Sequence, residues 1–444
     1  MGKQNTFFRA VCALAIPVAL QSMLQSSFSV VDQIMIGQLG SDSVAGVGLA
    51  GKFASIFSVV IAAVGAAAGI MLSQYLGQKN RAAVRRSFFT NLFLGVGIAA
   101  CFTALCLFFP DAVMGLYTKD PATRQEAADY LLLMAGTFLP MAGATLLSTL
   151  FRCIQRPQLP LYASIASALL NTGLNYLLIF GKLGITPMGV RGAALATVAS
   201  QWVNFLLMGL MLLICKPLPR RGGLRASGNW KQYLSILLPI LVCEVVWSLG
   251  ENVYAAIYGR MGTEAGAAMT LTNPVQGLLI GALCGLSQAA SVLIGKRLGE
   301  GNDDAAYRDS KKLILYGAIG AAVLSAVVLL TAPVYVLLYR VEEEVRSLTV
   351  QVLSVYALIA PVKVLNMILS GGILRSGGRT KYVMYIDMIG TWCFGVPLGL
   401  LAAFVLEWSI PWVYLLLSLE EGIRLGIAVA VFLKKRWMNR LEAA

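Results

Sequence analysis

Residues 17–50 read PVALQSMLQSSFSVVDQIMIGQLGSDSVAGVGLA, which joins the end of one apolar stretch to the start of the next. The first stretch, 11–37, is long enough to cross a bilayer, since a membrane-spanning helix needs about 20 apolar residues. It still contains polar residues at intervals of three and four, namely Ser22, Gln25, Ser29 and Asp32. On a helix this spacing places them on one face. Polar groups are costly against lipid, so this face is predicted to line a water-filled cavity.

Similar apolar stretches recur along the whole chain of 444 residues. Twelve are predicted, near 11–37, 44–75, 88–109, 130–150, 160–180, 192–214, 233–258, 265–294, 313–338, 348–370, 382–406 and 411–433. The composition agrees, because 58% hydrophobic and 13% charged residues lie outside the range of soluble domains. The fold class is therefore predicted to be an all-α integral membrane protein with twelve transmembrane helices.

The basic residues are distributed unevenly between these stretches. The net charge is +14, and 25 of the 35 Lys and Arg residues fall on the side that holds both termini. Cytoplasmic loops carry such an excess, so we expect a multi-pass protein of the plasma (inner) membrane with both termini in the cytoplasm. The positive charge thus reflects topology and predicts a lipid-bilayer environment, with no nucleic acid as a partner.

The two halves of the chain repeat at an offset of 222 residues. Pro17 corresponds to Pro239, and Asn80 to Asn302. Six helices are an even number, so both copies enter the membrane in the same direction, and the site is expected between them. We predict two parallel six-helix lobes around a central cavity, with the N lobe at 1–215, a cytoplasmic linker at 216–231 and the C lobe at 232–444.

The repeat also carries the polar stripe into the second half. Adding 222 to the first stripe gives Glu244, Trp247, Glu251 and Tyr254. An acidic and aromatic wall suits organic cations, so we predict a substrate cavity lined by these four residues together with Gln25 and Ser29. Hydrogen bonding between helices is the alternative for the Ser and Gln positions.

Asn171 and Asn175 lie one turn apart on the predicted helix 160–180. Both amides point the same way, and amide oxygens with the carboxylate of Asp32 would suit a hard cation such as Na⁺. Interhelical hydrogen bonding explains two asparagines equally well.

Other charged residues also lie within the predicted spans. Lys363 and Lys52 have no assigned partner, and Asp387 has a structural or a functional interpretation. Glu420 and Arg424 are spaced to pair on one helix.

Several classes of chemistry are excluded by residues that the sequence lacks. The chain has no histidine, which removes histidine metal ligands, Ser-His-Asp catalysis and histidine proton relays. It has no GxxxxGK[ST] motif for ATP and no CxxC pair. We therefore predict that the protein is not an enzyme and has no cofactor. We expect carboxylates to bind the coupling ion, H⁺ or Na⁺. We also expect the protein to be a monomer.

The quoted stretch resembles the first-helix signature of the multidrug and toxic compound extrusion (MATE) family. YLGQKNRAAVRRS (75–87) and RLGEGNDDAAYRDS (297–310) resemble the paired loops of that family, and GVRGAALATVAS (189–200) resembles the start of its sixth helix. The resemblance covers essentially the whole chain and is closest to the prokaryotic, damage-inducible-like branch.

This resemblance implies a secondary antiporter that exports organic, often cationic, compounds or drugs in exchange for H⁺ or Na⁺ by alternating access. It also implies an ion-coupling site at Asp32, Asn171, Asn175 and Thr197, with Asn175 standing where the family pattern has an aspartate. A flippase for a lipid-linked oligosaccharide, from the same wider superfamily, is the alternative.

Overall fold

The computed structural model describes residues 2–39, 41–118, 120–182, 184, 186–218, 230–339 and 341–442, without the side chains of 2–5, 30, 41–45 and 122. Most of the predicted linker, 219–229, lies outside the described residues, as does Gly40 of the quoted stretch. Within the described part the chain is helical, with no strand, as the composition predicts.

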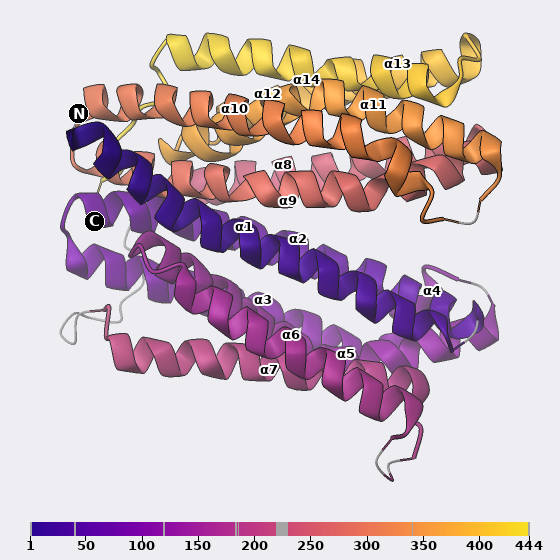
Figure 1. Ribbon diagram of the computed structural model, residues 1–444. Coiled ribbons are helices and arrows are strands. Elements are labelled where there is room, and N and C mark those ends of the chain that lie inside the picture. Colours follow the sequence, from indigo (N-terminus) through magenta and orange to yellow (C-terminus); the bar gives the residue numbers. More distant parts are fainter. Residues whose placement is uncertain are drawn as a thin grey trace. The chain divides into compact units, whose positions relative to one another are not determined.

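In its described residues, the first half of the chain forms seven helices, which Figure 1 labels α1 to α7. Their bounds are α1 (Gly2–Gly37), α2 (Ser41–Gly77), α3 (Arg81–Phe108), the short α4 (Pro110–Gly115), α5 (Pro121–Cys153), α6 (Gln158–Phe180) and α7 (Gly189–Cys215). The second half contains α8 (Trp230–Arg260), α9 (Thr263–Gly299), α10 (Asp303–Val336), α11 (Glu343–Asn366) and α14 (Ile410–Leu433). Between α11 and α14 the chain alternates between π-helical and α-helical segments, namely η1 (Met367–Leu374), α12 (Lys381–Met388), η2 (Ile389–Gly395), α13 (Val396–Leu400) and η3 (Leu401–Val405).

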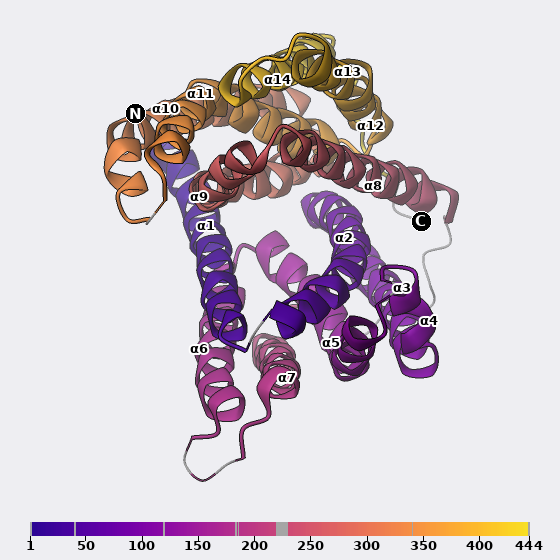
Figure 2. The ribbon, with the colours of Figure 1, turned by 90° about the vertical axis from the view of Figure 1, so that its right-hand side faces the viewer.

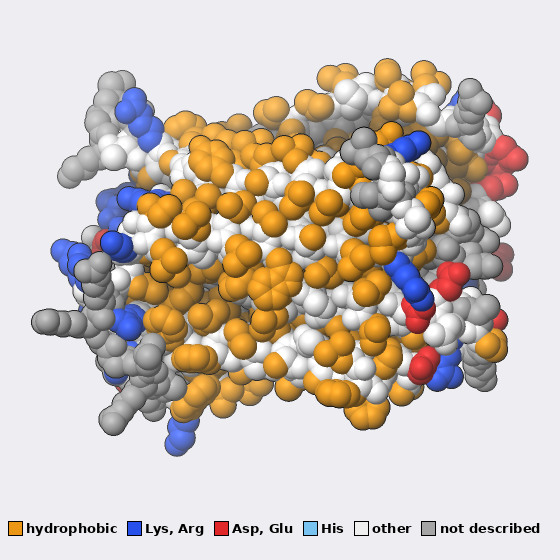
Figure 3. Space-filling model, turned by 90° about the horizontal axis from the view of Figure 1, so that it is seen from below, with side chains coloured by type: hydrophobic (Ala, Val, Ile, Leu, Met, Phe, Trp, Pro, Cys, Tyr) orange, Lys and Arg blue, Asp and Glu red, His pale blue; other side chains and the backbone are white. Residues whose placement is uncertain are grey.

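Eleven helical stretches in the described part of the chain are long and apolar enough to cross a membrane. The remaining predicted span, 411–433, coincides with α14, which carries Glu420, Glu421 and Arg424 near its middle. Figure 3 shows hydrophobic side chains over most of the face in view. Asp and Glu gather toward one end of that face, and Lys and Arg are most frequent at the other.

Two helix starts confirm the repeat at the level of local structure. Asn80 Oδ1 accepts a hydrogen bond of 3.0 Å from the backbone N–H of Ala83, and this caps α3. Asn302, 222 residues later, accepts one of 3.0 Å from Ala305 and caps α10 in the same way. An asparagine at this position satisfies one of the backbone donors that a helix start leaves free.

Contacts divide the chain into two compact units. We call the unit made of 20–72 and 80–229 the N unit, and the unit made of 1–19, 73–79 and 230–443 the C unit. Both α1 and α2 therefore pass from one unit to the other along their length. The lobe boundaries drawn from the sequence stay a prediction.

In the N unit, α5 packs against α3 and α7, and α6 lies beside α7 (Figure 2). In the C unit, α9 packs against η1, α10 and α11, while α11 also contacts α14. These pairings bring one face of α6 to α7, and one face of α11 to α14, which positions the polar residues described next.

The C unit also holds the last turn of α2. The side chain of Gln74 donates to the backbone oxygen of Ser376 at 2.8 Å and accepts from the N–H of Leu441 at 2.8 Å. Gly77 and Gly299 allow a close crossing, since a Cβ at Gly77 would lie 2.1 Å from Lys296 O and one at Gly299 would lie 2.0 Å from Gln74 O. Both pairs are related by the same offset of 222, so the crossing of α2 and α9 is symmetric.

Candidate functional site

One polar cluster lies in the N unit and joins three helices. Asn175 on α6 donates its amide to the carboxylate of Asp32 on α1. The same amide lies 3.2 Å from Oδ1 of Asn171, and the amide of Asn171 lies 3.5 Å from Oγ1 of Thr197 on α7. The structure therefore brings together the four residues that the sequence resemblance selects. We call Asp32, Asn171, Asn175 and Thr197 the amide cluster.

Close packing of α6 against α7 places these side chains. A Cβ at Gly192 would lie 2.8 Å from the backbone of Leu178, so glycine allows the two helices to approach. One helical turn before Asn171, Ser167 donates to the backbone oxygen of Ser200 at 2.8 Å. The amide cluster thus lies between the close approach at Gly192 and the hydrogen bond of Ser167.

The amide cluster contains an unpaired acceptor. Asn175 is 1% exposed, and within the described part of the chain its Oδ1 has no hydrogen-bond partner. A buried acceptor without a partner is unfavourable, because it has lost its water and gained nothing in return. Asp32 supplies a carboxylate nearby, and hard monovalent or divalent cations prefer oxygen ligands. The amide cluster therefore contains oxygen atoms of the kind that bind such cations.

The other two predicted residues on α1 lie apart from this hydrogen-bonded group. Gln25 and Ser29 are exposed and precede Asp32 by seven and three residues on the same helix. Earlier on α1, Gln21 donates to Ser164 Oγ at 2.9 Å, so that position acts as a helix-to-helix contact.

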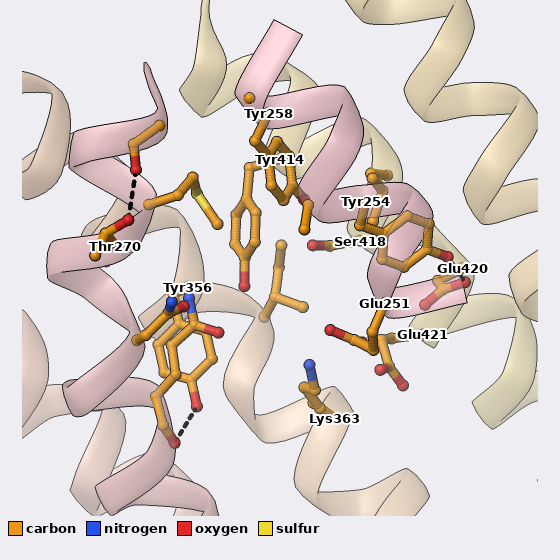
Figure 4. Close-up of a pocket in the computed structure, with 18 residues that line it drawn as sticks. Glu251, Tyr254, Tyr258, Thr270, Tyr356, Lys363, Tyr414, Ser418, Glu420 and Glu421 are labelled. Atoms are coloured by element: carbon orange, nitrogen blue, oxygen red, sulfur yellow. Dashed lines mark hydrogen bonds between the residues drawn. The ribbon is translucent and has the colours of Figure 1, made fainter. Parts of the chain in front are cut away.

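A pocket of about 470 Å³ lies in the C unit. It is formed by α8, α9, α11 and α14, and Figure 4 shows its polar and aromatic side chains converging from these helices. We call it the C-unit pocket. Its charged and aromatic lining consists of Glu251, Tyr254, Tyr258, Tyr356, Lys363, Tyr414, Glu420 and Glu421.

Two of the four predicted residues on α8 line this pocket, and two do not. Glu251 and Tyr254 belong to the lining, and the hydroxyl of Tyr254 donates to Glu420 at 2.6 Å. Glu244 instead accepts a hydrogen bond of 2.8 Å from the guanidinium of Arg375. Trp247 is 42% exposed and stands outside the lining. The structure therefore gives Glu244 a salt bridge rather than a place in the pocket.

Arg424 lies within 4.0 Å of three carboxylates at or beside the pocket. It donates to Asp387 and lies 3.5 Å from Glu421 and 3.9 Å from Glu420. The predicted pairing of Glu420 with Arg424 is present, but Asp387 is the closer partner. Asp387 also accepts from the thiol of Cys243 at 2.7 Å, which indicates a structural role for this carboxylate.

The π-helical segment η2 makes room for these charges. A Cβ at Gly395 would lie 2.1 Å from the hydroxyl of Tyr254 and 2.2 Å from Oε2 of Glu420. A Cβ at Gly390 would lie 2.2 Å from Cγ of Arg424. The π-helix is rare and is frequently found at functional sites, and here it brings two glycines against the charged groups.

Sequence reasoning missed most of the residues on α11 and α14. Tyr414, Ser418 and Glu421 are spaced by four and three residues, and Tyr356 and Lys363 by seven. This is the helical spacing that revealed the stripe on α1. Applied to these two helices, the same signal would have found their pocket-lining face.

A family model supports the repeat independently of these contacts. The MatE model matches residues 17–177 and again 239–401, and the two matches begin 222 residues apart. The chain belongs to the MatE family. This is the multidrug and toxic compound extrusion family that the sequence resembles.

Individual relatives cover nearly the whole MatE chain. A probable multidrug resistance protein NorM of Mesorhizobium japonicum is 27% identical, over 97% of this chain and 94% of the relative. The NorM of Thermotoga maritima is 25% identical, over 96% of this chain and 92% of the relative. Among solved structures, an aspartate-to-asparagine mutant of the Vibrio cholerae MATE transporter VcmN has a TM-score of 0.90 at 16% identity, over 98% of both chains. This likeness confirms the predicted all-α membrane fold.

Proposed function

We propose that this MatE protein is a secondary active antiporter that exports organic, often cationic, compounds in exchange for H⁺ or Na⁺. Relatives named as multidrug resistance proteins support export of such compounds. The observation that carries the proposal is the amide cluster, in which a carboxylate and three neutral oxygen-bearing side chains meet inside membrane-spanning helices. Ionisable groups at such depth are rare and mark ion pathways.

The amide cluster has one carboxylate, that of Asp32, since Asn175 contributes an amide. One H⁺ or one Na⁺ neutralises one carboxylate, so we propose that a single cation is bound per cycle. A cation that moves inward supplies about 2.3 kcal/mol per charge per 100 mV of membrane potential, in addition to its concentration gradient. This energy is available to drive export against a gradient of the compound.

Substrate binding is proposed for the polar faces of α1 and α8. Gln25 and Ser29 belong to the first face, while Glu251 and Tyr254 belong to the second, where they line the C-unit pocket. An organic cation is attracted both by a carboxylate and by the face of an aromatic ring. We propose alternating access between the lobes 1–215 and 232–444, in a plasma-membrane monomer with both termini in the cytoplasm.

The experiment uses the purified chain in proteoliposomes loaded with ethidium, a fluorescent organic cation. A pH gradient or a Na⁺ gradient is imposed, each without the other. Faster ethidium extrusion under at least one inward gradient, abolished by an ionophore that collapses it, is the expected result. If the extrusion rate under each gradient equals the rate with no gradient, antiport is contradicted.

A further inference from the structure

The charged groups of the C-unit pocket differ in the hydrogen bonds and ion pairs that the protein provides for them. Glu420 accepts from Tyr254 at 2.6 Å, and Glu421 accepts from the amide of Asn366 at 2.8 Å. Both also lie within 4.0 Å of Arg424. Glu251 and Lys363 are different: in the described part of the chain neither has a side-chain hydrogen bond or an ion pair within 4.0 Å. The pocket therefore offers one uncommitted carboxylate and one uncommitted ammonium.

These two groups face the same space. Figure 4 shows the carboxylate of Glu251, from α8, and the ammonium of Lys363, from α11, both pointing into the pocket near its centre. Glu421, from α14, lines the same pocket. Because no direct ion pair closes the gap, a ligand can reach both groups at once.

The signs of the two charges restrict the ligand. A simple organic cation at Glu251 would be repelled by Lys363, and a simple anion at Lys363 would be repelled by the carboxylates. A charge at membrane depth is costly when it stays unpaired, so either ligand would leave one group unsatisfied. A compound with both an amine and an acid group pairs with both.

The remaining lining indicates an aromatic body. Tyr258, Tyr356 and Tyr414 approach from three helices, and aromatic side chains favour stacked or edge-to-face contact with another ring. The volume of about 470 Å³ lies within the range of pockets that hold small organic ligands.

We propose that the C-unit pocket binds zwitterionic aromatic amino compounds, with Lys363 holding the acid group and Glu251 holding the amine. This assignment rests on the proposed export function, since it names the class of compound carried. Lys363 is then a specificity residue. The sequence alone predicts an acidic cavity, and Lys363 supplies the positive charge that would bind the acid group of the ligand.

The test measures binding of three indole compounds to the purified full chain by calorimetry, with no ion gradient. Tryptophan is the zwitterion, tryptamine lacks the acid group, and indole-3-propionate lacks the amine. Tryptophan is expected to bind at least about tenfold more tightly than either, since a hydrogen bond to a charged group contributes about that factor. Equal affinity for tryptophan and tryptamine, or no binding of tryptophan, overturns the proposal.

Variants assign the two ends of the ligand. Lys363→Met is expected to weaken tryptophan binding about tenfold and to strengthen tryptamine binding, whereas Lys363→Arg keeps the wild-type order. Glu251→Gln is expected to weaken both amines and to spare indole-3-propionate. Lys52→Met, which removes an exposed lysine on α2, is the matched control and leaves all three affinities unchanged. A Lys363→Met protein that is folded and keeps the wild-type preference for tryptophan contradicts the assignment.

This result is separable from the fate of the antiport proposal. Binding without a gradient can favour tryptophan even if no ion drives transport. Conversely, an ion gradient can drive ethidium extrusion while tryptophan binds no more tightly than tryptamine. That result would support the antiport proposal and contradict the zwitterion proposal.

Discussion

Asn175 donates a hydrogen bond to the carboxylate of Asp32 although the two residues are 143 positions apart in the chain. The contact joins α1 to α6, and the amide of Asn175 also lies 3.2 Å from Oδ1 of Asn171, whose own amide lies 3.5 Å from the hydroxyl of Thr197. An amide at this position supplies a donor where a second carboxylate would supply only acceptors. Asp32 therefore accepts a hydrogen bond that an ionised carboxylate at position 175 could not donate.

Replacing Asn175 by aspartate tests how this arrangement handles cations. The Asn175→Asp variant places two carboxylates in contact, and like charges at this distance repel unless a cation lies between them. We expect a lower melting temperature than wild type in choline chloride, and a larger increase on exchange to NaCl. A ligand at 100 times its Kd stabilises the folded state by about 2.7 kcal/mol. An equal increase in melting temperature on exchange to NaCl in variant and wild type would contradict cation binding at the amide cluster.

Arg424 is expected to be a major determinant of stability in the C unit. The Arg424→Leu variant leaves Asp387, Glu420 and Glu421 without their shared counter-charge, and removing one partner of a buried ion pair costs about 3–5 kcal/mol. Thermal unfolding in detergent measures the loss. Arg191→Leu is the matched control, since its pair with Asp129 is 66% and 38% exposed and such pairs contribute about 0–1 kcal/mol. Equal losses for the two variants would contradict the role given to Arg424.

Gly395 is expected to tolerate no side chain. The Gly395→Ala variant places a methyl group 2.1 Å from the Tyr254 hydroxyl and would break its hydrogen bond to Glu420. Overpacking of this kind costs about 1–3 kcal/mol, and we expect weaker ligand binding in the pocket as well. Gly422→Ala on α14 is the control, because nothing lies within 4 Å of its added Cβ. If the Gly395→Ala protein is as stable as the Gly422→Ala protein, the backbone of η2 shifts at little cost and the prediction is wrong.

The crossing of α2 and α9 predicts two variants with matching effects. A Cβ at Gly77 or at Gly299 meets a backbone oxygen, which cannot rotate away as a side chain can. We expect Gly77→Ala and Gly299→Ala to lower the melting temperature by similar amounts, because the two contacts are equivalent under the repeat. Gly277→Ala, where the added Cβ meets nothing within 4 Å, should leave it unchanged. A large effect at one glycine alone would argue against a symmetric crossing.

The polar stripe on α1 and the asparagine pair on α6 could be found from the sequence because both depend on helical spacing, which is local. The same holds for the twelve spans, although the charges on α14 weaken its signal. The family resemblance then added Thr197, which no spacing argument selects. The structure places this threonine 3.5 Å from the amide of Asn171.

The partners of the buried charges in the C unit could not be predicted in this way. Arg375 meets Glu244 across 131 residues, and Arg424 meets Asp387 across 37. Both pairings depend on how α8, α12, η1 and α14 pack, and on glycines in π-helical segments that leave room for charged side chains. Helical periodicity places Glu244 and Glu251 on one face, but it does not tell which of them has a cationic partner.

The most direct measurement of the central claim is ion-driven ethidium extrusion by wild-type and Asp32→Asn protein in the same proteoliposomes. The asparagine keeps the shape of the side chain and removes its charge, so the variant is expected to lose the gradient-driven component of extrusion and to stay folded. Asp111→Asn, an exposed acid outside the amide cluster, should transport like wild type. Gradient-driven extrusion by Asp32→Asn at the wild-type rate would contradict the role of Asp32 as the coupling carboxylate.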